Sequence, residues 1–367
     1  MRRWSALVAA ALLLWLACVP AAEATDILDE VWDAAGADAV AEAGEDVVEQ
    51  ELDWNLDLAA GLNDLLDRAA EELATLLKEA LRSGVLLLLT VLLAEMMAGL
   101  GAGVPGGWKD GVRVIATLTI TGLAVSDAGS LIDLGRETIQ ELDVFTQILT
   151  PVMATACAAA GNATGAAVRQ VATLLCSSVL ISLVDRLFLP LVYGYIAMAA
   201  GACATGNQGL SAVAGLLKWC VTTALKGVLM VYTAFLSFAS LAAGGTDAMT
   251  ARLTKSAISG LVPVVGGILS DAADTLLAGA GMLRSVLGIF GVLAVLGFCL
   301  TPFLRLGMQY LMYRAVAVLA AVFPNAGLSG LIEELGSAFG LVLGMTGACA
   351  LLTLISIFAA MAAVLPT

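Results

Sequence analysis

The run from Val85 to Gly101 reads Val-Leu-Leu-Leu-Leu-Thr-Val-Leu-Leu-Ala-Glu-Met-Met-Ala-Gly-Leu-Gly, and Glu95 is its one charged residue. Similar apolar runs recur from here to the last residues, and about 20 such residues cross roughly 30 Å of hydrocarbon as an α-helix. The chain is 60% hydrophobic and 13% charged, with a mean hydropathy of +0.97, whereas soluble domains are about half apolar and a quarter charged. The sequence therefore predicts an all-α, polytopic helical membrane protein.

Apolar candidate spans follow one another along the chain at residues 85–101, 114–129, 144–160, 171–200, 216–243, 258–277, 286–303, 311–323 and 339–364. Because several are short or interrupted by glycine and proline, we expect about seven to nine crossings. Residues 127–143 are acidic, whereas the connections that contain Arg252 and Arg305 are basic. The positive-inside rule then places the basic connections in the cytoplasm and the acidic one outside, together with the N-terminus.

Two further segments precede the spans. Residues 1–24 contain Arg2 and Arg3, a short apolar run and Ala22-Glu-Ala24, the spacing that signal peptidase cuts. We expect a signal peptide here, with an uncleaved anchor as the alternative. Residues 25–82 hold 17 acids and three bases among apolar residues at helical spacing, which predicts an acidic, amphipathic extracytoplasmic segment. Residues 83–367, with 13 acids and 12 bases, form the predicted helical transmembrane domain.

The composition excludes several classes of function. The chain has no histidine, so Ser-His-Asp and Cys-His catalysis are ruled out. It has no G-x-x-x-x-G-K-[ST] motif, and its seven cysteines are scattered singly, as small buried hydrophobes are. We therefore expect no enzymatic activity, no cofactor and no bound metal. The net charge of −14 also argues against a nucleic-acid partner and leaves the lipid bilayer as the expected surrounding.

The candidate site lies in the segment Leu261-Val-Pro-Val-Val-Gly-Gly-Ile-Leu-Ser-Asp-Ala-Ala-Asp-Thr-Leu-Leu-Ala-Gly279. A helical period gives it one small and polar face, and the proline begins or kinks the helix. The site residues are Pro263, Gly266, Gly267, Ser270, Asp271, Asp274 and Thr275. Small residues four apart let another helix approach closely, whereas broken helices with carboxylates also form ion sites in transporters. A packing face and a cation or proton path both remain open.

The main other charges inside candidate spans are Glu95, Asp185 and Arg186. Ionisable groups in hydrocarbon are costly, so each is a candidate for function or for helix pairing. Asp185 and Arg186 are adjacent and point to different helix faces, which favours pairing with other helices over pairing with each other.

Four blocks of the sequence together resemble the stage III sporulation protein AE family of endospore-forming bacteria. They are Leu261 to Gly267, Ser270-Asp-Ala-Ala-Asp-Thr275, Gly288-Ile-Phe-Gly291 and Tyr313-Arg-Ala-Val-Ala-Val-Leu-Ala320. The order of the blocks matches over roughly the last 280 residues, whereas the acidic N-terminal segment matches only in kind.

The resemblance implies a component of the transenvelope channel, or feeding tube, between mother cell and forespore, needed for late forespore development. It implies other stage III sporulation membrane proteins, ring-forming channel components and a separate cytoplasmic ATPase as partners. The expected location is the mother-cell (outer forespore) membrane, with the N-terminal segment in the intermembrane space. No catalytic residue is carried over. The alternative from another class is an ion-coupled permease that uses Asp271 and Asp274.

Overall fold

The computed structural model describes residues 32–33, 35–45, 47–48, 56–100, 107–160, 163–261, 266–323 and 326–362; the side chains at 163–164, 237–278, 326 and 362 are excepted. Within these ranges the chain is helical and contains no strand, which confirms the all-α prediction. The elements are α3 (Ala37–Gly44), α4 (Leu58–Leu100), α5 (Trp108–Ala159), α6 (Ala163–Leu183), η1 (Val184–Phe188), α7 (Leu189–Thr205), α8 (Gln208–Leu261), α9 (Gly266–Ala320) and α10 (Ala326–Ala362).

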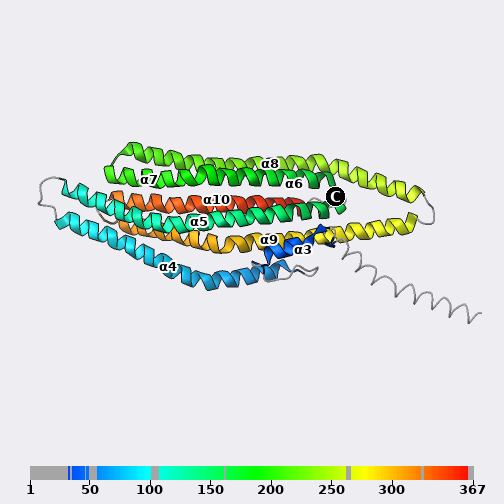
Figure 1. Ribbon diagram of the computed structural model, residues 1–367, viewed down its shortest axis with the longest axis horizontal. Coiled ribbons are helices and arrows are strands. Elements are labelled where there is room, and N and C mark those ends of the chain that lie inside the picture. The colour runs from blue at the N-terminus through cyan, green and yellow to red at the C-terminus, as the bar shows by residue number, and fades with distance from the viewer. Residues whose placement is uncertain are drawn as a thin grey trace, which may run out of the picture.

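The long helices lie side by side in one elongated bundle (Figure 1). α10 packs against every helix from α5 to α9, and α9 also packs against α4. More than half of the most apolar window of α9 and of α10 is buried, against about a third or less in the other long helices. α9 and α10 therefore form the centre of the bundle, and α4 lies at its edge, on α9 and α5.

The outer surface of the bundle is rich in exposed apolar side chains. Leu93 and Met96 on α4, and Ile115 and Leu118 on α5, each expose more than 60% of their surface. Such a surface is costly in water and matches the hydrocarbon of a bilayer, where a helix satisfies its own backbone hydrogen bonds. This pattern supports the membrane class that the composition predicts.

Six helices in the described part of the chain are long and apolar enough to cross a membrane, when α6, η1 and α7 are counted as one continuous helix. The sequence predicts seven to nine crossings. The counts differ because two pairs of neighbouring candidates merge and because candidate 258–277 includes residues that the structure does not describe. Candidates 114–129 and 144–160 belong to α5, and candidates 286–303 and 311–323 belong to α9. The acidic loop expected at 127–143 and the basic connection expected at Arg305 are therefore wrong, because both are helical. The basic connection at Arg252 likewise falls within α8.

The helices are much longer than a bilayer requires. α5 has 52 residues, which at a rise of 1.5 Å each is about 78 Å, whereas the hydrocarbon core is roughly 30 Å thick. A large part of each such helix therefore lies outside the hydrocarbon. α4 likewise runs without a break from Leu58, in the acidic segment, to the end of the first apolar run. The predicted signal peptide at residues 1–24 lies outside the described residues.

Glycines bring the central helices into close contact. A Cβ built at Gly135 on α5 would lie 2.8 Å from Cγ1 of Val342 on α10, and one at Gly288 on α9 would collide with Met361. At Gly291 the Cβ would lie 2.9 Å from Cδ2 of Leu149. Larger side chains would separate these helices, so the Gly288-Ile-Phe-Gly291 block is a packing motif.

Candidate functional site

Polar side chains from five helices form two networks of hydrogen bonds and ion pairs, which adjoin where Tyr313 and Arg314 follow each other on α9. They come from α5, α7, α8, α9 and α10. We call this set the polar belt; its members are Asp127, Tyr195, Lys218, Gln309, Tyr313, Arg314, Glu333, Glu334 and Ser337.

One half of the polar belt joins α5 to α9. Gln309 donates from Nε2 to Oδ2 of Asp127 at 2.9 Å, and the hydroxyl of Tyr313 donates to the same oxygen at 3.2 Å. Gln309 and Tyr313 are buried, and the ring of Tyr313 packs edge-on against Phe339 with centroids 5.0 Å apart. Asp127 is therefore the acceptor for two buried donors, which would be costly to leave unsatisfied.

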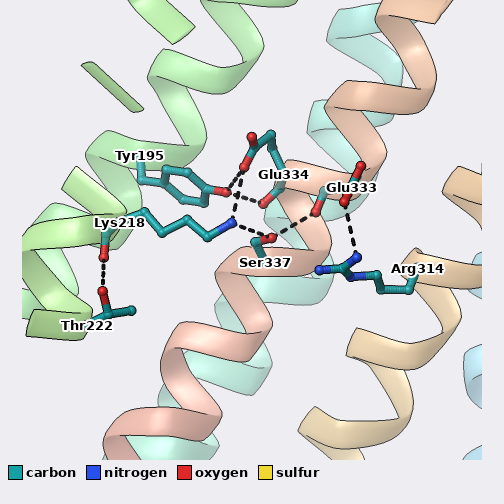
Figure 2. Close-up of polar contacts among 7 residues, drawn as sticks. All are labelled: Tyr195, Lys218, Thr222, Arg314, Glu333, Glu334 and Ser337. Carbon is teal, nitrogen blue, oxygen red and sulfur yellow. Dashed lines mark hydrogen bonds and ion pairs between the residues drawn. The ribbon is translucent and has the colours of Figure 1, made fainter. Parts of the chain in front are cut away.

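The other half joins α9 to α10, α7 and α8 (Figure 2). Arg314, next to Tyr313 in the chain, pairs with Glu333 at 3.1 Å. Tyr195 donates to both the backbone and the carboxylate oxygens of Glu334. Lys218 donates to Ser337 at 2.9 Å and lies 3.6 Å from the carboxylate of Glu334. The neighbouring glutamates of α10 thus reach opposite sides of the helix, each toward one cation.

The polar belt is neutralised largely from within. Its two cations face its two glutamates, and the carboxylate of Asp127 accepts hydrogen bonds from neutral donors. Networks of this kind hold helices in one register, because removing one member leaves its partners unsatisfied. No group of three or more metal-binding side chains occurs in the part of the chain that the structure describes. These contacts can therefore fix five helices relative to one another.

A polar cleft of about 380 Å³ opens beside Asp127, between α4, α5 and α9. Its polar lining residues are Glu79, Arg82, Ser83, Asp127, Ser130, Arg305 and Gln309. Both signs of charge face it, so it can admit water and small polar solutes to one end of the polar belt.

A separate ion pair joins α5 to the short π-helical segment η1. Arg136 donates from Nε to Oδ1 of Asp185 at 2.9 Å. This contact confirms the prediction that Asp185 pairs with a residue of another helix. Single π-helical turns inside a longer helix are frequent at functional sites. Here the extra residue in the turn accompanies an interhelical ion pair.

The structure does not describe the contacts of the predicted site. Pro263 lies outside the described residues, and the side chains of Gly266, Gly267, Ser270, Asp271, Asp274 and Thr275 are also outside them. The backbone from Gly266 onward is α-helical, as the periodicity predicts. Whether Asp271 and Asp274 form a packing face or an ion path therefore stays a proposal.

Sequence reasoning missed most of the polar belt. Asp127 begins the segment expected to be an acidic loop, and Glu333 and Glu334 lie between two candidate spans, so none of the three indicates a network inside the bundle. Lys218 lies inside candidate span 216–243, and its position alone gives it no role. A search for single charges flanked by apolar residues would have selected Lys218. Tyr313 and Arg314 were quoted as part of a family block, but without a role.

Three of the six described cysteines are buried, as the sequence predicts, and the other three are partly exposed. Cys157, Cys299 and Cys349 are buried, and all six cysteines in the described part of the chain are free thiols. Cys18 lies outside it.

The fold and the polar belt define a class, a multi-pass helical membrane protein whose long bundle is joined by an internal polar network. A family model of stage III sporulation protein AE matches residues 50–364, so the chain belongs to that family. Stage III sporulation protein AE of Bacillus subtilis (strain 168) is 25% identical over 198 residues, which are 54% of this chain and 50% of the relative. The aligned region thus spans about half of the relative's length. No solved structure matches the chain. Family membership supports a role in sporulation.

Proposed function

We propose that the protein is a membrane component of the transenvelope channel complex between mother cell and forespore, and that late forespore development needs it. The observation that carries this proposal is the family match over residues 50–364 in a chain built of helices long enough to extend beyond a bilayer. A bundle that projects from the membrane offers surface both to lipid and to other proteins of an assembly.

The proposed partners are other stage III sporulation membrane proteins and ring-forming channel components, with a separate cytoplasmic ATPase. The proposed location is the mother-cell (outer forespore) membrane, with the acidic segment of residues 25–82 in the intermembrane space. We propose a structural role without catalysis. The absence of histidine and of a nucleotide-binding motif supports it.

A clean deletion in the source organism tests the proposal, with late forespore reporter expression and forespore size as the readouts. The expected result is completed engulfment, failed late expression and shrunken forespores, all restored by the intact gene. Normal spores at normal frequency, with no paralogue to compensate, would contradict the proposal.

The ion-coupled permease alternative has its own test, in which Asp271 and Asp274 are both changed to alanine. Loss of protein or of the assembled complex is expected if these residues pack helices together. Normal assembly with loss of solute or ion movement would favour the permease instead.

A further inference from the structure

Two buried arginines near the C-terminal end of α5 carry charge that the described residues do not neutralise. Arg169 on α6 is 5% exposed and Arg284 on α9 is 7% exposed. Nη2 of Arg169 and both Nε and Nη1 of Arg284 are buried without a hydrogen-bond partner. Neither arginine forms an ion pair with a carboxylate of the described ranges, although four other bases do.

The two guanidinium groups converge on one side chain. Both interact with the thiol of Cys157, which is buried on α5 and also lies 3.7 Å from the carbonyl oxygen of Ala360. We call Cys157, Arg169 and Arg284 the arginine pocket. A thiol is a weak hydrogen-bond partner, so it does not satisfy the buried Nη2 of Arg169 or the buried Nε and Nη1 of Arg284.

A small cavity lies next to this pocket, between α5, α6 and α10. Arg169 and Cys157 line it, together with the polar side chains of Gln170, Thr353 and Ser356. Its volume is about 20 Å³, enough for roughly one water-sized or monatomic species. A tetrahedral oxyanion such as phosphate is too large for it. The cavity therefore combines hydrogen-bond donors with space for one small ion.

The positive charges of the two arginines favour an anion at this site. An arginine stays protonated in proteins, so neither residue can relieve its burial by losing a proton. Two like charges around one thiol repel each other, and an unpaired buried charge costs several kcal/mol. A monovalent anion near both guanidinium groups attracts each of them and so offsets their mutual repulsion.

We propose that the arginine pocket binds one chloride ion, held in the cavity by the guanidinium group of Arg169 and the polar side chains beside it, and attracted also by the charge of Arg284 next to Cys157. The ion acts as the counter-charge that lets α5, α6 and α9 pack at this end of the bundle. The folded protein then depends on chloride, because an ion that binds the folded state alone shifts unfolding toward higher temperature.

The test uses the full chain purified in detergent micelles, with sodium chloride exchanged for sodium gluconate at constant ionic strength. The expected result is a saturable rise of the thermal unfolding midpoint with chloride, by roughly 3 °C or more. Bromide is expected to substitute for chloride. Equilibrium dialysis with radiolabelled chloride is expected to give one ion per chain.

Two variants assign the binding to the pocket. Arg284→Met is expected to raise the half-saturating chloride concentration at least tenfold. The matched control Arg186→Met removes an exposed arginine of η1 and should leave it unchanged. If Arg284→Met does not fold, competition between bromide and labelled chloride on the native chain decides instead.

Three results would overturn the proposal. Equal midpoints in chloride and gluconate, with no chloride retained on dialysis, would show that no such ion binds. An equal response to chloride and sulfate would show general screening. A response to phosphate or to phosphatidylglycerol vesicles without a response to chloride would assign the pocket to a phosphate group.

Discussion

The polar belt and the arginine pocket lie in the same bundle, yet their charges are balanced in opposite ways. In the polar belt the cation of Arg314 meets Glu333, and that of Lys218 meets Glu334. In the arginine pocket the guanidinium groups meet a thiol and no carboxylate of the described residues. One cluster is therefore neutralised by the protein's own side chains, whereas the other is balanced by the proposed ion from outside.

The largest effect is expected where the polar belt loses an acceptor. Asp127→Leu leaves the buried donors of Gln309 and Tyr313 unsatisfied, at about 1–3 kcal/mol each, so unfolding should become roughly 2–6 kcal/mol easier. Thermal unfolding in micelles and abundance in membranes measure the loss. Asp133→Leu, at an exposed position of α5, is the control. Equal stability of the two variants would show that Asp127 does not hold the polar belt together.

An effect of opposite sign is expected in the arginine pocket. In chloride-free buffer, Arg284→Met removes an unpaired buried charge and should stabilise the fold by about 1–4 kcal/mol. In saturating chloride the same change should be neutral or destabilising. Comparing the unfolding midpoints of the variant and the native chain in the two buffers gives the sign. Destabilisation in both buffers would mean that Arg284 is neutralised by the protein itself.

A smaller effect is expected from the packing that positions both clusters. Gly135→Ala places a methyl group 2.8 Å from Val342 and should cost about 1–3 kcal/mol by overpacking the contact of α5 with α10. Gly129→Ala on the same helix meets no atom within 4 Å and should gain up to about 1 kcal/mol. Melting curves of the two variants measure this contrast. A gain in both would mean that the helices are farther apart than described.

The smallest effect is expected at the ion pair beside η1. The Arg136 side chain is 50% exposed and that of Asp185 is 27% exposed, so Arg136→Met should cost only about 0.2–1 kcal/mol. Arg186→Met serves as the comparison, and a thermal melt is sensitive enough to rank the two. A loss as large as that of Asp127→Leu would place this pair among the essential contacts of the bundle.

The sequence predicts the class of fold well, because long apolar runs have few alternatives to membrane helices. It predicts the number of helices less well, because charges at residues 127–143 and at Arg305 look like loops. In the structure these charged residues lie within helices, and the side chains of Asp127 and Arg136 form hydrogen bonds with side chains of neighbouring helices. Such partners are far apart in sequence, as with Asp127 and Gln309, and a single sequence does not pair them.

The candidate site shows the same limit. The helical period predicts that Ser270 and Asp274 lie on one face of a helix, but it does not predict which residues contact that face. The sequence predicts that Asp185 pairs with a residue of another helix, and the structure identifies that residue as Arg136. The arginine pocket was not predicted, because nothing in the sequence around Arg169 or Arg284 indicates that both reach Cys157.

The central claim is that the polar belt has a structural role and no chemical one. Complementation of the deletion with the triple variant Asp127→Leu, Gln309→Leu, Tyr313→Phe tests it most directly, because the triple variant removes the unsatisfied donors together with the carboxylate. The account predicts that membrane abundance and late forespore expression both return to near the native level, whereas Asp127→Leu alone loses both. Native abundance without late forespore expression would contradict the account and assign the carboxylate of Asp127 a role in moving ions or solutes.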